Sequence, residues 1–171
     1  VQANQLSAIV PYAVAGTSET KVQVQYRGVK SNAVSVAVAA SAPGIFTADS
    51  SGRGPGAILN QDYSLNSAAN PAARGSIVIV YATGEGETDP QVADGRIASA
   101  REMPKPKLPV KVLIGGQEAE VLYAGCAPGL VVGLLQVNVR VPQGVVPGAA
   151  VPVVLKIGEA ISPDGVTVAV R

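Results

Sequence analysis

The clearest strand signal in the chain is LLQVNVRV, residues 134–141. Its side chains alternate, so that one face carries Leu135, Val137, Val139 and Val141 and the other carries Gln136, Asn138 and Arg140. A period of two over this length predicts a β-strand with one buried face. The same alternation predicts strands at 21–26, 34–38, 151–157 and 166–170.

Other segments complete this pattern. Residues 76–82 are apolar on both faces, which is typical of a central strand. Further strands are predicted at 6–10, 110–114 and 118–123, the last two joined by a two-residue turn at Gly115-Gly116. Gly, Pro, Asn or Asp interrupts the strands about every ten residues, and no segment keeps a helical period. The predicted class is all-β.

Composition agrees with this class and excludes several functions. Of 171 residues, 28 are valine, a β-branched residue that favours strands. Charged residues make up 15%, and 13 basic against 12 acidic side chains leave a net charge of +1. This balance gives no electrostatic attraction for nucleic acid. No apolar run approaches the ~20 residues of a membrane helix, so we expect no membrane insertion.

The missing residue types narrow the chemistry further. Without histidine, a Ser-His-Asp triad, a Cys-His pair and imidazole metal sites are excluded. The single cysteine, Cys126, closes no disulfide within the chain and is expected to be buried as a small apolar residue. We expect neither an enzyme nor a bound cofactor. Because the chain starts at Val1 without a leader pattern, we interpret it as a mature or trimmed product of an exported protein.

An internal repeat is the most informative feature of the sequence. Residues 5–38 match residues 136–170 through an ordered series of landmarks. They are Gln5 and Gln136, Pro11 and Pro142, Gly16 and Gly148, Gly28 and Gly158, Ser31 and Ser162, and a closing Val-x-Val-x-Val at 34–38 and 166–170. The second copy follows about sixty residues of predicted strands, whereas nothing comparable precedes the first.

The repeat predicts three segments. Residues 75–171 have the size of a complete immunoglobulin-like β-sandwich, residues 1–40 match only the C-terminal half of a second one, and residues 41–74 form an ordered connector. Three strands alone bury little apolar surface and leave an unpaired edge. The missing half is therefore trimmed away, or another chain supplies it by β-strand addition, or the three strands pack on the complete module.

Motifs along almost the whole chain resemble a known family. They are Ala42-Pro43-Gly44-Ile45-Phe46, Asn60-Gln61-Asp62, Ala69-Asn70-Pro71-Ala72, Arg74-Gly75, Tyr81-Ala82-Thr83-Gly84 with Gly86, Ile114-Gly115-Gly116, Tyr123-Ala124-Gly125, Ala127-Pro128-Gly129, and Gln136-Val137-Asn138 before Val141-Pro142. This series is similar to the Solibacter-type uncharacterised C-terminal domain of acidobacterial secreted proteins. The resemblance implies tandem IPT/TIG-like immunoglobulin-like modules in exported surface proteins, and it implies no catalytic residues. The chain departs from the family at Glu85 and Glu87, where apolar or neutral residues are expected.

An acidic loop is the one candidate metal site. Glu85, Glu87, Asp89 and Asp94 offer carboxylate oxygens of the kind that Ca²⁺ prefers. Their spacing is not that of a calcium loop, and Pro90 limits how the loop folds back. The favoured interpretation is a solvated loop without metal.

The favoured function is structural. We expect an exported, non-catalytic module of the cell surface or of an extracellular fibre, which associates into a homo-oligomer or polymer by strand complementation. The residues expected to carry this pairing are Leu6, Ile9, Val22, Val24, Val34, Val36 and Val38. The alternative is an accessory carbohydrate- or protein-binding domain of a larger secreted protein, although few aromatic residues are present to form such a site.

Overall fold

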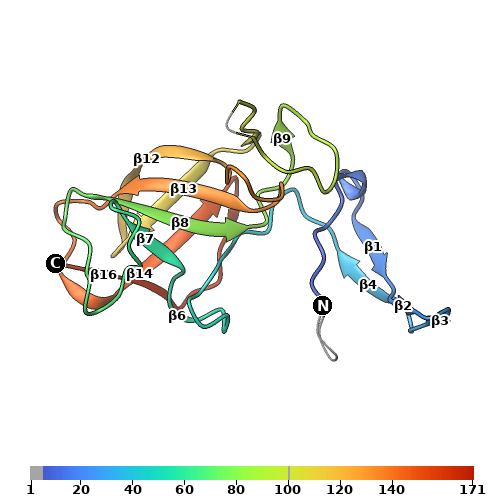
Figure 1. Cartoon of the computed structure of the whole chain (residues 1–171), viewed down its shortest axis with the longest axis horizontal. Helices are drawn as coiled ribbons and strands as arrows, with labels where there is room; N and C mark the ends of the chain where they lie inside the picture. Colours follow the sequence, from blue (N-terminus) through green and yellow to red (C-terminus); the bar gives the residue numbers. More distant parts are fainter. Residues whose placement is uncertain (1–5, 100) are drawn as a thin grey trace.

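The structure, a computed structural model, describes residues 6–99 and 101–171. The all-β class is confirmed: the described residues form strands and one short 3₁₀ helix, η1 (Tyr12–Val14), and no α-helix. Two parts are visible in Figure 1, a body that contains most of the strands and a narrow hairpin that projects from it.

The body is built on one long sheet. Its strands lie in the order β5 (Gly44–Ile45), β8 (Ile77–Thr83), β13 (Leu135–Arg140), β12 (Gln117–Cys126), β11 (Val110–Ile114), β14 (Gly148–Ile157), β16 (Val166–Val170) and β6 (Gly54–Pro55). Two further strands join it at the sides, β7 (Ile58–Asn60) beside β8 and β15 (Ala160–Ile161) beside β14. Every pairing is antiparallel except that of β16 with β6. The sheet folds over through β12, whose first residues pair with β11 and whose last residues pair with β13.

The two halves of the folded sheet enclose one core. The alternate residues that face inward from β8, β13, β14 and β16 belong to the same buried cluster. Most of them are valine, whose branched side chain packs well on a pleated surface. This layered burial is the main source of the body's stability.

The connector predicted at 41–74 is ordered and forms part of the body. Its strands β5 and β7 cover the outer edge of β8, and β6 covers the outer edge of β16 together with Ala72. The strands that end the sheet here are only two or three residues long, so the free edge that they leave is short.

Most strands predicted from alternation are present with shifted ends. The strand predicted at 6–10 is wrong: these residues are exposed and belong to no sheet. A strand needs a partner for its backbone groups, and none lies beside this segment. Residues 21–26 are divided between β1 (Glu19–Val22) and β2 (Gln25–Tyr26).

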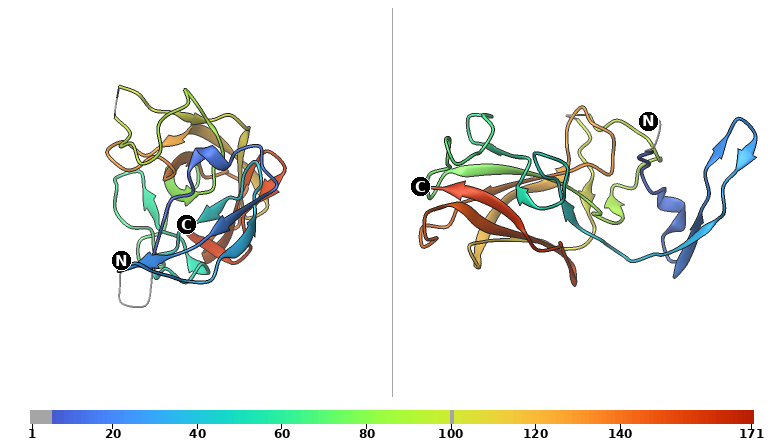
Figure 2. Two further views of the ribbon diagram at one scale, coloured as in Figure 1. Left: turned by 90° about the vertical axis from the view of Figure 1, so that its right-hand side faces the viewer. Right: turned by 90° about the horizontal axis from the view of Figure 1, so that it is seen from below.

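The projecting hairpin, residues 19–37, is called the arm below. In it β1 pairs with β4 (Val34–Ala37), and β2 pairs with β3 (Val29–Lys30) around a two-residue turn. Figure 2 shows from a second direction that the arm extends away from the body. No other strand pairs with the outer edge of β1 or β4 among the described residues.

The base of the arm is held against the body at two places. Before the arm, the Tyr12 backbone N–H donates to Asp94 Oδ1 at 2.8 Å. After the arm, the chain crosses two glycines of the loop that follows β8, where the Ala42 N–H donates to the Gly84 carbonyl oxygen at 2.9 Å. Gly84 and Gly86 have φ values of +78° and +76°. A Cβ on either one would overlap the carbonyl oxygen of Ala42 or Ala40.

Gly84→Ala should therefore destabilise the body more than a matched glycine replacement does. Gly95 also has a positive φ, +73°, but open space surrounds it. Both substitutions incur the strain of the left-handed backbone, and only Gly84→Ala adds overlap with neighbouring backbone. The expected difference in the free energy of unfolding is about 1–3 kcal/mol, measured by chemical denaturation. Equal losses for the two variants would show that the crossing at Gly84 is not tightly packed.

Candidate functional site: the apolar face of the arm

The arm is amphipathic. Alternation along its strands and the pairing of Val22 with Val34 put six apolar side chains on one face: Val22, Val24, Tyr26, Val29, Val34 and Val36. The opposite face is polar, and there the Ser35 hydroxyl donates to Glu19 Oε1 at 2.9 Å. One polar and one apolar face are typical of a strand pair that covers a core.

The apolar face of the arm is bare. Its six side chains are 43–75% exposed, whereas a hairpin on a core buries such residues. A surface hollow lies near the tip, lined by Val24, Tyr26, Arg27, Val29, Lys30 and Ser31. An isolated two-stranded hairpin is at best marginally stable in water, so this face lacks the contact that would stabilise it.

The structure brings together only some of the residues predicted for pairing. Val22, Val24, Val34 and Val36 share the apolar face of the arm. Leu6 and Ile9 are exposed but lie in the segment that forms no strand, and Val38 is half-buried just beyond β4.

Tyr26 and Val29 were missed by the sequence analysis. They are 69% and 75% exposed at the tip of the arm, where they pair across the turn. Tyr26 and Val29 share a face because the turn lies directly between them. The alternation in the sequence did not show where this turn would be.

The arm has the same hydrogen-bonded plan as the hairpin that ends the chain. In the arm, Gln25 pairs with Lys30 and Tyr26 with Val29. In the body, Lys156 pairs with Ile161 and Ile157 with Ala160. Both sets of pairs enclose a two-residue turn. Farther from the turn, Thr20 faces Val36 in the arm just as Val151 faces Val168 in the body.

A pair of serines repeats the same bonds in both hairpins. The Val24 N–H donates to Ser31 Oγ at 3.0 Å, and the Ser31 N–H donates to the Val24 carbonyl oxygen at 2.8 Å. Leu155 and Ser162 make the same two bonds at the same two distances. The two hairpins therefore share the same pairs around the turn and the same serine bonds, although one more residue separates Ser162 from Val166 than separates Ser31 from Val34.

The difference between the hairpins is burial. Val153, Leu155, Val166 and Val168 are at most 3% exposed, and they occupy the positions that Val22, Val24, Val34 and Val36 occupy in the arm. The valines of the arm thus hold positions that are buried in the body's hairpin, but in the arm they are exposed to solvent.

The acidic loop is not a cluster of solvated carboxylates. Glu85, expected in solvent, is 2% exposed, and this expectation was wrong. Gly84 and Gly86 carry the backbone close to the crossing chain, so the side chain between them is enclosed. The other three carboxylates remain at the surface. Glu87 forms an ion pair with Lys107 at 3.2 Å, and Asp94 accepts a hydrogen bond from the Tyr12 N–H. Asp89 is exposed in the short strand β9 (Thr88–Asp89), which pairs with β10 (Lys105–Pro106).

Glu85 lies in a small buried cluster. Its Oε1 is 3.7 Å from Cys126 Sγ, and its Oε2 has no hydrogen-bond partner. Burial raises the pKa of Glu85 to about 7, although the Cys126 thiol opposes the shift. Burial and the nearby Glu85 raise the pKa of Cys126 to about 12. The prediction that Cys126 is a buried apolar residue is confirmed, since its exposed fraction is zero.

Tyr12 connects this cluster to the start of the arm. Its ring packs against the buried group of Val92, Ala98, Cys126 and Val132. Burial raises the pKa of Tyr12 to about 12, with Glu85 adding to the shift. At neutral pH the tyrosine and the cysteine are therefore uncharged, and Glu85 is the group in the cluster that titrates.

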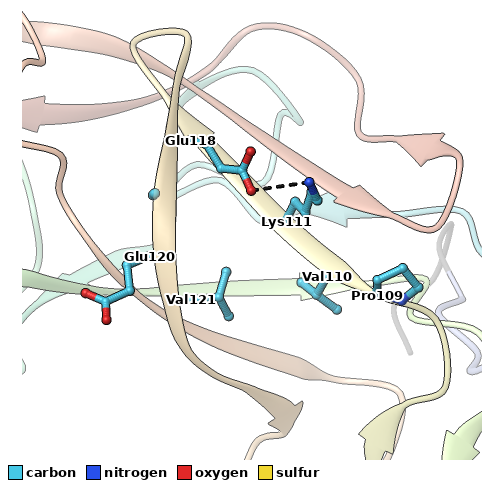
Figure 3. A pocket seen from close by; sticks show the side chains of 7 residues that line it. Pro109, Val110, Lys111, Glu118, Glu120 and Val121 are labelled. Carbon is cyan, nitrogen blue, oxygen red and sulfur yellow. Dashed lines mark ion pairs between the residues drawn. The ribbon is translucent and has the colours of Figure 1, made fainter.

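A second surface hollow lies in the body. Figure 3 shows an open hollow between β11 and β12, where Lys111 and Glu118 point toward each other at 3.3 Å. Glu120 lines the same hollow, but its carboxylate pairs with Arg140 at 2.8 Å. Within residues 6–99 and 101–171 no three His, Cys, Asp or Glu side chains are grouped as metal ligands. In the same residues no helix is long and apolar enough to cross a membrane.

No protein-family model, curated protein or solved structure matches this chain. The resemblance to the acidobacterial secreted domain stays a prediction.

Proposed function

We propose that this chain is a non-catalytic structural module that associates with further copies through its arm. The single observation that carries the proposal is the bare apolar face of the arm, whose counterparts in the body are buried. Exposed contiguous apolar surface with open strand edges favours association with another polypeptide. Backbone pairing at these edges, together with burial of valine side chains, would supply the binding energy.

The finer identity of the fold is part of the same proposal. We infer an immunoglobulin-like β-sandwich for the body and the last hairpin of a second such module for the arm. Two features support this inference: the antiparallel layers around one core, and the pairing and serine bonds that the arm shares with the hairpin formed by β14, β15 and β16. The resemblance to acidobacterial secreted domains adds a surface or extracellular fibre as the site of action.

A structural role is also supported by the lack of any group of metal-ligating side chains within residues 6–99 and 101–171. The chain has no histidine. Its strongly shifted groups, Tyr12, Glu85 and Cys126, are enclosed at the base of the arm rather than arranged around a hollow. Catalytic groups with shifted pKa values are normally found where a substrate can reach them.

Light scattering of the full chain over a wide concentration range, with electron microscopy of the same samples, tests this function. Val24→Asp places a charge on the apolar face of the arm. Gln25→Asp places one on the polar face, opposite Lys30, and is the matched control. We expect the unmodified chain and Gln25→Asp to associate as concentration rises, and Val24→Asp to remain at the mass of one chain.

Two results would oppose the proposal. If the unmodified chain keeps the mass of one chain at all concentrations, self-association through the arm is wrong, and the alternative of an accessory binding domain is favoured. If both aspartate variants associate as the unmodified chain does, assembly takes place through another surface.

A further inference from the structure

The segment that leads into the arm lies beside a buried carboxyl group. This segment, residues 9–14, is called the strap below, and it contains η1. We propose that Glu85 and the strap form a pH-sensitive latch: the strap docks against the protonated carboxyl and is released more often when the carboxyl loses its proton. The inference goes beyond the proposed self-association and does not depend on it.

Glu85 is enclosed from several sides at once. It lies between Gly84 and Gly86, whose backbone lies against the chain that crosses at residues 40–42. Its Oε1 is 3.7 Å from Cys126 Sγ at the end of β12. Its Oε2 has no hydrogen-bond partner among the described residues, although the side chain is 2% exposed. A carboxylate at this position therefore lacks the hydrogen bonds that would compensate for burial of its charge.

The strap forms another wall of this site. Ile9 lies directly on Gly133, since a Cβ placed on that glycine would be 3.0 Å from Ile9 Cγ2. The Gly133 N–H in turn acts on the Glu85 carboxyl. Tyr12 packs on the buried group that contains Cys126, and its own pKa is raised by burial and further by Glu85. Both residues that hold the strap on the body therefore lie close to Glu85.

The strap is held by few contacts. Ile9 is 48% exposed. Within the part of the chain that the structure describes, one backbone hydrogen bond joins the strap to the body, from the Tyr12 N–H to Asp94 Oδ1 at the surface. Segments with few buried contacts open locally while the rest of the protein stays folded. Release of the strap would leave the arm attached through the crossing at Gly84 and Gly86 alone.

The other ionisable groups around Glu85 are neutral near pH 7. Burial raises the pKa of Tyr12 and of Cys126 to about 12. Burial also raises the pKa of Tyr123, whose hydroxyl donates to the Cys126 carbonyl oxygen at 2.8 Å. The crossing chain at 40–42 contains no ionisable side chain. Asp94 is the remaining acid near the strap, and it accepts the Tyr12 N–H.

The direction of the pH effect follows from burial. Burial raises the pKa of Glu85 from 4.5 to about 7 while the strap is docked. Once the strap leaves, water reaches the carboxyl and its pKa falls back toward 4.5. The docked state therefore binds the proton more tightly, so docking is most favourable below pH 4.5 and weakens as pH rises through about 7. Between pH 5 and 8 the ratio of released to docked strap should rise by about tenfold or more, because each unit of pKa difference is a factor of ten.

Labelling of the single cysteine measures release, because Cys126 is fully buried in the group that Tyr12 covers. A dithiodipyridine, which also reacts with thiols at acid pH, is added to the full chain at low concentration, at pH 5 and at pH 8. The labelling rate is proportional to the fraction of chains whose thiol is uncovered. Division by the rate for Glu85→Gln at the same pH removes the pH dependence of the thiol itself and of Asp94. We expect this quotient to be about tenfold or more higher at pH 8 than at pH 5.

Two further variants make the test specific. Glu87→Gln removes a surface carboxylate from the same loop, where it pairs with Lys107, and this variant should behave as the unmodified chain does. Tyr12→Ala removes the ring that covers the buried group, so its thiol should react faster than that of the unmodified chain at both pH values. Low concentrations of urea should change the labelling rate little, because local release exposes less surface than unfolding does.

Three results would overturn the latch. Equal quotients at pH 5 and pH 8 would show that Glu85 does not control the strap. Labelling of Tyr12→Ala as slow as that of the unmodified chain would show that the strap does not cover the thiol. A steep rise of the rate with urea would show that the thiol reacts only when the whole body unfolds. None of these results bears on self-association, which the scattering measurements decide separately.

Discussion

Leu155→Ala should lower the free energy of unfolding by about 2–5 kcal/mol, whereas Val24→Ala should change it by less than about 0.5 kcal/mol. The two residues hold the same place in two hairpins with the same hydrogen bonds to a serine. Leu155 is fully buried in the core, so its truncation removes apolar contacts and leaves a cavity. Val24 is 43% exposed and leaves no cavity.

Chemical denaturation at low protein concentration measures both values, because the chain is then expected to be single. A loss of more than 1 kcal/mol for Val24→Ala would mean that the arm already has a packed core within one chain. A small loss for Leu155→Ala would mean that β14 is not part of the main core. Either result would remove the contrast on which the interpretation of the arm depends.

The second large effect is a fall in stability as pH rises toward neutrality, caused by Glu85. Burial raises the pKa of this carboxyl from 4.5 to about 7 in the folded chain. A raised pKa means that the folded state favours the protonated form. The contribution of Glu85 to the free energy of unfolding is therefore fully present below pH 4.5 and is lost as pH rises through about 7. The shift corresponds to about 3 kcal/mol.

Denaturation curves between pH 4.5 and 8 check this prediction, with Glu85→Gln as the matched variant. Glutamine has nearly the same size as glutamate and cannot ionise. The free energy of unfolding of this variant should therefore not fall as pH rises toward neutrality. No histidine is present to titrate in the same range. The neighbouring Cys126 and Tyr12 stay neutral there, because the pKa of each is raised to about 12. Parallel pH profiles for the two proteins would show that Glu85 does not titrate in a buried position.

Strands with strict alternation were the part of the fold that the sequence predicted well. Residues 134–141 and 151–157 contain β13 and much of β14, because one polar and one apolar face leave little choice of conformation or register. The turn at Gly115-Gly116 was also predicted correctly, and both glycines have positive φ values. In these segments local preference and tertiary packing act in the same direction.

Segments that depend on a distant partner were not predictable in this way. Strands β5 and β6 are only two residues long. They are extended because they pair with the edges of β8 and β16. Residues 6–10 show the opposite case: a strand pattern without a neighbouring strand to pair with. Local sequence specifies a preference for extended backbone, but a paired strand forms only where a second strand lies beside it.

The buried position of Glu85 was also hidden from local pattern. A glutamate between two glycines is typical of an exposed loop, and nothing nearby in the sequence identifies Tyr12 and Cys126 as its surroundings. One signal was available: the family resemblance led us to expect an apolar or neutral residue at position 85.

Hydrogen–deuterium exchange of the unmodified chain at low and high concentration tests most directly whether the arm gains its missing layer from a second copy. A lone hairpin opens easily, so its amides exchange fast until packing stabilises it. We predict that exchange within residues 19–37 slows at high concentration while exchange in β8, β13, β14 and β16 stays the same. Equal exchange of the arm at both concentrations would contradict the account.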